Sequence, residues 1–113
     1  MIALVLLAGA VGAVIRYLVS RSVGTVAGVL AVNVLGSAIG GAVLALAERE
    51  YLSADLRLVL LTGFCGGLTT FSTWSVETVQ LAMAGKWRTA VVSVAGNLVL
   101  GVGAAAIAYL ALR

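Results

Sequence analysis

Hydrophobic residues fill long, uninterrupted stretches of this chain, and charged residues occur almost only between those stretches. The apolar segments cover residues 2–19, 25–47, 58–84 and 89–112. A stretch of about 20 apolar residues is long enough to cross the hydrocarbon core of a membrane as an α-helix. The pattern therefore predicts an all-α membrane protein with four transmembrane helices in a single domain, residues 1–113.

Short connections and small residues predict how these helices pack. Because the connections are short, neighbouring helices are expected to be antiparallel, with both termini on one side. Glycines four residues apart let membrane helices approach closely. Such pairs occur at Gly24 and Gly28, Gly36 and Gly40, and Gly63 and Gly67. The chain has no proline, so a helix break is expected to come from glycine.

The composition excludes several classes of protein. The 113 residues are 63% hydrophobic and 10% charged, and a soluble domain of this length could not bury so much apolar surface. The opening MIALVLL lacks the basic residues of a secretory signal, so none is expected. The basic residues are scattered, which argues against nucleic acid as a partner. With no histidine and with Cys65 alone, expected to be a packing residue, no transition-metal site is expected.

The basic residues give little indication of orientation. Lysine and arginine in short loops normally decide which way a membrane protein inserts. Here one predicted side carries Arg16, Arg21, Lys86 and Arg88, and the other carries Arg49, Arg57 and Arg113. A chain with so small a bias can insert both ways up, and the two forms could pair as an antiparallel dimer. The alternative is that Arg16 and Arg21 alone orient the chain.

Two predicted helices carry amide side chains on faces of small residues. Asn33 is followed on one face by Gly36, Ser37, Gly40 and Gly41, and Ser93 and Asn97 begin a similar stripe in the last helix. Asn33 either bonds a neighbouring helix or offers its amide to a passing ion, and an amide can serve an anion or a cation. The stripe of Ser93 and Asn97 either lines a wet track or holds helices together.

The segment GFCGGLTTFSTWS, residues 63–75, interrupts the third apolar stretch. Each of its glycines lowers helix stability by about 1 kcal/mol relative to alanine, so a broken third helix is predicted. Unwound backbone inside a membrane is tolerated where it faces protein, water or an ion, and transporters use such breaks to hold ions. The hydroxyls of Thr69, Thr70, Ser72, Thr73 and Ser75 can cover the freed backbone groups or face a pore.

Three further residues follow this break. Phe71 and Trp74 lie three residues apart and share a helical face, where they either pack together or turn a positive ring edge toward an anion. Glu77 is the acidic residue expected inside a helix, which makes it a functional candidate. Alternatively, Glu77 reaches the membrane interface or pairs with Lys86 or Arg88. The residues alone therefore indicate a dimeric membrane protein that handles a small ion.

The chain resembles the CrcB/Fluc family of fluoride channels. The resemblance covers almost the whole chain and rests on GAVGAVIRY (9–17), VNVLGS (32–37) and, above all, the segment 63–75. It implies a homodimer of four-helix subunits with antiparallel, dual topology, surrounded by membrane lipid. It also implies two pores that export fluoride passively across the cytoplasmic membrane of a prokaryote.

The resemblance also implies roles for individual residues. Asn33 becomes a pore-lining donor, and Phe71 a ring whose edge meets fluoride. A structural sodium ion at the dimer centre would be held by the carbonyl groups of Gly66 and Thr69 from both subunits. We expect fluoride to exchange its water in succession for Asn33, ring edges and the hydroxyls of Ser72 and Thr73. Sodium and Arg16 would supply positive potential from outside this path.

The sequence departs from the family pattern at three positions. Trp74 stands where the family usually has a second phenylalanine, and it brings a larger ring and an N–H donor. Val29 stands where threonine is frequent, one turn before Asn33. Asn97 stands where a pore-facing serine is common. The resemblance therefore predicts the architecture more directly than it predicts selectivity for fluoride.

Other functions are weighed against this expectation. A proton-coupled multidrug exporter with four helices needs an ionisable acid in its first helix; this one has none, so Glu77 would have to serve. A third possibility is an assembly subunit without transport, in which the polar residues only join helices. An enzyme is least expected, because no acid–base pair or nucleophile with an activating base is present.

Overall fold

The computed structural model describes all 113 residues, and all of its secondary-structure elements are helices. Four stretches are long and apolar enough to cross a membrane: Ile2–Val23, Thr25–Glu48, Ala54–Met83 and Trp87–Leu112. This confirms the predicted all-α chain with four membrane-length helices. The elements, in order, are α1 (Ile2–Val23), α2 (Thr25–Glu48), α3 (Ala54–Arg57), the π-helix η1 (Leu58–Cys65), α4 (Gly66–Leu68), α5 (Phe71–Met83) and α6 (Trp87–Leu112).

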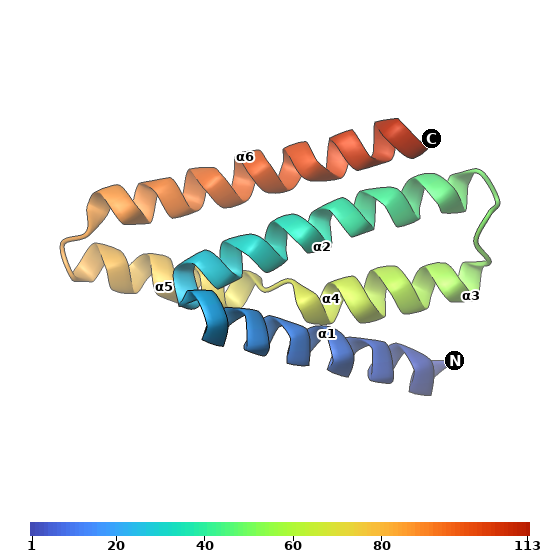
Figure 1. Ribbon diagram of the computed structural model, residues 1–113, viewed down its shortest axis with the longest axis horizontal. Helices are drawn as coiled ribbons and strands as arrows, with labels where there is room; N and C mark the ends of the chain where they lie inside the picture. Colours follow the sequence, from blue (N-terminus) through green and yellow to red (C-terminus); the bar gives the residue numbers. More distant parts are fainter.

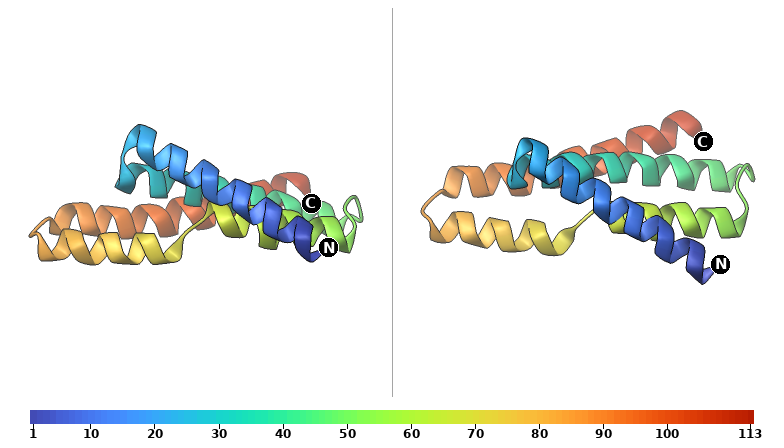
Figure 2. Two further views of the ribbon diagram at one scale, coloured as in Figure 1. Left: turned by 90° about the horizontal axis from the view of Figure 1, so that it is seen from below. Right: turned by 60° about the horizontal axis from the view of Figure 1, so that its bottom comes forward.

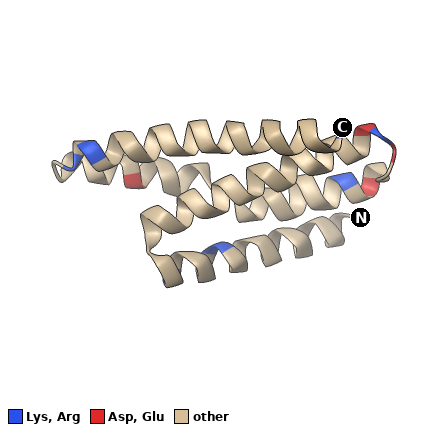
Figure 3. Ribbon diagram, turned by 45° about the horizontal axis from the view of Figure 1, so that its top comes forward, with Lys and Arg blue, Asp and Glu red and all other residues tan.

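The helices form an elongated, antiparallel bundle whose two termini lie at the same end (Figure 1). α2 and α6 lie alongside each other, and α1 crosses η1 and α4 obliquely (Figure 2). Charged residues gather mainly at the two ends of the bundle (Figure 3). Apart from Arg16 and Glu77, this arrangement leaves the middle of the bundle to apolar, small and uncharged polar side chains.

Glycine allows α1 to lie directly against the third membrane-length stretch. Gly12 is buried, and a Cβ atom at this position would lie 2.5 Å from the carbonyl oxygen of Phe64 and 2.7 Å from the nitrogen of Leu68. A Cβ atom at Gly63 would lie 2.9 Å from the carbonyl oxygen of Val5. The backbones of these elements therefore meet without side chains between them, as small residues permit in membranes.

The connection between α1 and α2 also depends on glycine. Gly24 joins the two helices alone, with φ 94° and ψ 162°, a conformation that residues with a Cβ rarely adopt. The first turn of α2 lies directly against the end of α1, where a Cβ at Gly28 would lie 2.6 Å from the Cα of Ser20. The chain therefore reverses direction in very little space.

The third membrane-length stretch contains two residues with extended backbone angles. Thr69 has φ −84° and ψ 157°, and Thr70 has φ −148° and ψ 116°. These two residues separate α4 from α5. They come after the glycines of the segment 63–75, and Gly63 and Gly67 are themselves helical and face α1. The Oγ1 of Thr70 caps α5 by accepting the N–H of Thr73 at 3.1 Å.

Little of the chain is buried within a single subunit. Only 17 of the 113 residues are buried, and most large apolar side chains face outward, among them Leu6, Val99 and Ile107. Such a surface is suited to lipid or to another membrane subunit rather than to water.

Candidate functional site

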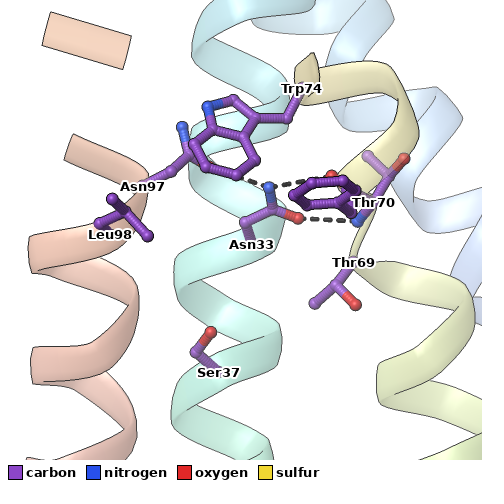
Figure 4. A pocket seen from close by; sticks show the side chains of 8 residues that line it. Asn33, Ser37, Thr69, Thr70, Trp74, Asn97 and Leu98 are labelled. Atoms are coloured by element: carbon purple, nitrogen blue, oxygen red, sulfur yellow. Dashed lines mark hydrogen bonds between the residues drawn. The ribbon is translucent and has the colours of Figure 1, made fainter. Parts of the chain in front are cut away.

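A cavity of about 250 Å³ opens beside the extended residues Thr69 and Thr70 (Figure 4). Its walls come from α2, from α6 and from the start of α5, so three of the membrane-length stretches contribute. The lining residues are Asn33, Ser37, Thr69, Thr70, Phe71, Trp74, Asn97 and Leu98. None of these side chains carries a charge, although most of them are polar or aromatic.

Asn33 supports the extended segment by binding both polar groups of the Thr70 backbone. Its Oδ1 accepts the N–H of Thr70 at 2.8 Å, and its Nδ2 donates to the Thr70 carbonyl oxygen at 3.2 Å. A backbone N–H can only donate, so this pair fixes which way the Asn33 amide points. In a continuous α-helix the same N–H would bind the carbonyl of Gly66.

The amide of Asn33 is also bonded to the last helix. Its Nδ2 donates to the Oδ1 of Asn97 at 2.8 Å, and the Nδ2 of Asn97 donates to the Ser93 carbonyl oxygen at 2.8 Å. Both N–H groups of Asn33 are therefore engaged, whereas Asn97 uses one of its two. Asn33 joins helices in this structure, and its role as a donor to an ion stays a prediction.

The hydroxyl groups after the glycines mostly bind nearby backbone or one another. Thr69 donates from its Oγ1 to the Cys65 carbonyl at 2.9 Å, and Ser75 donates to the Phe71 carbonyl at 2.8 Å. Thr70 donates from its Oγ1 to the Oγ1 of Thr73 at 3.0 Å. These hydroxyl groups therefore cover backbone groups near the extended segment. Covering such groups is one of the two roles predicted for them, and facing a pore is the other.

Ser72 and Thr73 lie outside the Asn33 cavity. They line a separate pocket of about 380 Å³ with Thr25, Val76, Glu77 and Gln80. The extended Thr70 separates these hydroxyls from the cavity because the backbone changes direction there. Ser93 reaches the Asn33 network through its carbonyl group, not through its hydroxyl.

The two aromatic residues predicted at the site form one wall of the cavity. The rings of Phe71 and Trp74 are 5.5 Å apart between centroids and meet at 73°, an edge-to-face arrangement. Phe71 is exposed and Trp74 is half-buried. The indole nitrogen of Trp74 is itself buried and has no hydrogen-bond partner.

Backbone carbonyl groups, rather than acidic side chains, are the available cation ligands here. Gly66 and Thr69 line a further pocket of about 630 Å³ with the small residues Gly36 and Gly40. The N–H of Thr70, which would otherwise bind the Gly66 carbonyl, binds Asn33. Neutral carbonyl oxygens at an unwound segment suit sodium, and no cluster of three His, Cys, Asp or Glu residues exists in the chain.

Arg16 and Glu77 are the two charged residues predicted to matter near the extended segment. Arg16 donates from its Nε to the carbonyl oxygen of Gly67 at 3.2 Å, which ties α1 to α4. Glu77 is buried, with 9% of its surface exposed, and its Oε2 has no hydrogen-bond partner. It therefore lies inside the bundle rather than reaching outward from it.

Two features of the cavity are not apparent from the sequence. The peptide group of Thr70 is the main partner of Asn33, and a side-chain pattern gives no signal for a backbone partner. Leu98 lines the cavity next to Asn97, and its apolar side chain does not stand out from its neighbours. Val29, one turn before Asn33, is buried in the core and does not line the cavity.

Comparison with known proteins extends these observations. The family model described as CrcB-like protein, Camphor Resistance (CrcB), matches residues 3–109. A protein of Phocaeicola vulgatus called fluoride-specific ion channel FluC is 40% identical over 105 residues, covering 88% of this chain and 87% of the relative. A protein with the same name from Shewanella sp. strain ANA-3 is 43% identical over 103 residues, covering 86% of this chain and 83% of the relative.

Proposed function

The chain belongs to the CrcB family, and we propose on this basis that it is a fluoride-selective ion channel that exports fluoride passively and relieves its toxicity. It is a multi-pass membrane protein, and the family and the names of its relatives support ion conduction rather than catalysis. The observation that supports conduction best is the Asn33 cavity, because uncharged polar and aromatic side chains surround it in the middle of the bundle. We place it in the cytoplasmic membrane of a prokaryote.

The chemistry of the cavity suits a small, strongly hydrated anion. Fluoride must exchange its water for other donors before it can pass a narrow path. Asparagine N–H groups and ring edges offer partial positive charge, whereas a lysine or arginine in the path could hold the anion too tightly for release. No charged side chain lines the cavity, and Arg16 lies outside it, bound to Gly67.

The hydroxyls of Ser72 and Thr73 extend this path beyond the aromatic pair. They line a separate pocket along α5, together with Glu77 and Gln80, so the proposed path would pass from the Asn33 cavity into this pocket. In this arrangement the anion meets amide and aromatic groups first and hydroxyl groups afterwards. Ser93 acts by positioning Asn97 through its carbonyl group.

The working unit is an antiparallel homodimer with dual topology. The nearly even division of basic residues between the two sides supports insertion in both orientations. The small number of buried residues and the open pocket beside Gly36 and Gly40 support a helical partner in the membrane. A second copy of the chain would complete pores that a single subunit leaves open.

A sodium ion would stabilise this dimer from the extended segment. The carbonyl groups of Gly66 and Thr69 of both subunits would hold it, with Thr69 and Thr70 as the break of a discontinuous third helix. When bound, the ion supplies fixed positive charge near the anion path. Asn33 contributes to this site by taking the Thr70 N–H away from the Gly66 carbonyl.

A proton-coupled multidrug exporter is not favoured. The helix α1 contains no acidic residue, so proton coupling would depend on Glu77. The relatives that cover most of this chain carry the name of a fluoride channel.

Efflux from liposomes tests the proposed function. The purified protein is reconstituted into liposomes loaded with fluoride or chloride, and release is followed with ion-selective electrodes after a potassium ionophore sets the voltage. We expect rapid fluoride release that follows the voltage, with little chloride release. Equal release of both anions, or no release above that of empty liposomes, would contradict the proposal.

A further inference from the structure

The indole N–H of Trp74 is a buried donor without a partner. Buried indole groups normally find an acceptor, because an N–H removed from water without one destabilises the fold. The other tryptophan, Trp87, differs in being 65% exposed. An acceptor that enters the cavity beside Trp74 would satisfy this donor.

Asn97 places a second donor on the same cavity. The N–H of Thr70 fixes the amide of Asn33, whose Nδ2 then requires an oxygen from Asn97. The Nδ2 of Asn97 must in consequence face away from Asn33, where one of its N–H groups binds the Ser93 carbonyl. The backbone N–H of Thr70 therefore sets the orientation of the Asn97 amide through Asn33. One N–H of Asn97 remains without a partner.

These two donors lie at one end of the cavity. Trp74 and Asn97 both line it, and Figure 4 shows the amide nitrogen of Asn97 turned toward the indole of Trp74. Phe71 meets Trp74 edge to face on the same wall. No carboxylate lines the cavity to compete for the N–H groups or to repel an anion.

We infer that the indole N–H of Trp74 and the free amide N–H of Asn97 form a hydrogen-bonding subsite for fluoride. This inference rests on the proposed function and adds to it a site that phenylalanine at position 74 could not provide. An N–H donates a stronger hydrogen bond to an anion than the C–H edge of a ring. Fluoride, the smallest halide, forms the strongest hydrogen bonds with such donors, which offset part of its larger dehydration cost, and we expect the subsite to prefer it to chloride.

Proton–nitrogen NMR of the indole groups tests the subsite directly. The full-length protein, labelled with ¹⁵N at tryptophan, is titrated in detergent micelles with sodium fluoride against sodium chloride at constant ionic strength. Trp87→Phe assigns the two indole signals and serves as the matched control, because Trp87 lies away from the cavity. We expect the Trp74 signal to move and saturate with fluoride, while the Trp87 signal stays constant.

Two variants extend the test. Asn97→Ala is expected to raise the fluoride concentration for half-saturation by about tenfold, the typical effect of losing one hydrogen bond to a charged group. Trp74→Phe keeps an aromatic ring but lacks the N–H, and we expect weaker fluoride binding with the dimer intact. A Trp74 signal that fluoride leaves unchanged, or that chloride moves equally, would overturn the subsite.

The same preparation separates this inference from the proposed function. Fluoride release from liposomes together with an unresponsive Trp74 signal would overturn the subsite and leave the channel standing. A responsive Trp74 signal without fluoride release would support the subsite as a binding site and contradict the channel. If a second copy of the chain already accepts the indole N–H, the signal will not respond, and the subsite is wrong.

Discussion

Asn33 binds the peptide group of Thr70 on both sides, accepting its N–H at 2.8 Å and donating to its carbonyl oxygen at 3.2 Å. Through this one side chain, α2 satisfies backbone groups that the extended segment would leave without helical partners. The same amide continues to Asn97 on α6. The cavity therefore depends on a residue that holds its walls together as well as facing it.

Replacing Asn33 by leucine tests this arrangement. Asn33→Leu keeps the branched shape and the number of side-chain heavy atoms but leaves two backbone groups of Thr70 unpaired, each at a cost of about 1–3 kcal/mol. We expect fluoride release to fall at least about tenfold and the midpoint of thermal unfolding in detergent to drop. Leu35→Ala, on the exposed face of the same helix, is the control and should behave like the parent. Release by Asn33→Leu at the rate of the parent would refute the role of Asn33.

Packing of α1 against the third stretch gives a prediction about stability. In Gly12→Ala the new Cβ meets the carbonyl oxygen of Phe64 and the backbone nitrogen of Leu68, so the helices must separate. Overpacking of this kind typically destabilises a fold by about 1–3 kcal/mol. Gly103→Ala is the matched control, because nothing lies within 4 Å of its Cβ. Thermal unfolding in detergent should distinguish the two variants; equal midpoints would show that α1 can move away freely.

The number and character of the helices could be predicted because the signal is long and local. Charges at residues such as Arg49 and Lys86 mark helix ends, and the apolar stretches between them exceed the thickness of a bilayer. The site was only partly predictable. Asn33, Trp74 and Asn97 stand out as polar groups in apolar surroundings, and the structure brings them to one cavity.

The remaining features of the site depend on backbone geometry. Ser72 and Thr73 follow Phe71 closely in sequence but line a different pocket, because Thr70 is extended and turns the start of α5. The partner of Asn33 is a peptide group, and every residue offers one, so the sequence cannot select it. The orphan N–H of Trp74 likewise becomes visible only when its surroundings are known.

Removal of sodium tests the proposed cation site. The ligands are backbone carbonyls of Gly66 and Thr69, so no side-chain substitution deletes them, and the ion itself must be exchanged. We expect purification in N-methyl-D-glucamine to reduce fluoride release and weaken the dimer, and added sodium to restore both with saturation. Thr69→Ser, which can keep the hydroxyl bond to Cys65, should still respond to sodium. A protein that stays dimeric and active after thorough sodium removal would count against the site.

Glu77 distinguishes a channel from a proton-coupled exporter. Glu77→Gln keeps the size of the side chain and removes its charge from the pocket that Ser72 and Thr73 line. We expect fluoride release to persist and to follow voltage alone, since an anion path gains nothing from a nearby carboxylate. The measurement is release from liposomes with and without a pH gradient. Proton-driven efflux of an organic cation that disappears in Glu77→Gln would favour the exporter instead.

Dual topology predicts that one added basic residue fixes the orientation of the chain, and that the side on which it is added decides which orientation results. Ala84→Lys adds a basic residue to the side of Lys86 and Arg88, whereas Glu50→Lys adds one to the side of Arg49. Basic residues in short loops remain on the cytoplasmic side, so each variant should insert predominantly in one orientation, opposite to the other. If the channel is an antiparallel dimer, each variant alone should protect cells poorly against fluoride.

Co-expression completes this test, because opposite orientations can then meet in one membrane. Cells that produce both variants should regain the fluoride resistance of cells with the parent chain. To check that each variant has a single orientation, Cys65 is replaced by alanine and one cysteine is added in a loop. Its labelling by a reagent that cannot cross the membrane then reports whether that loop faces outward. Full resistance from one variant whose orientation is uniform would mean that parallel subunits suffice. Antiparallel pairing would then be wrong, although the cavity at Asn33 and its fluoride chemistry would remain.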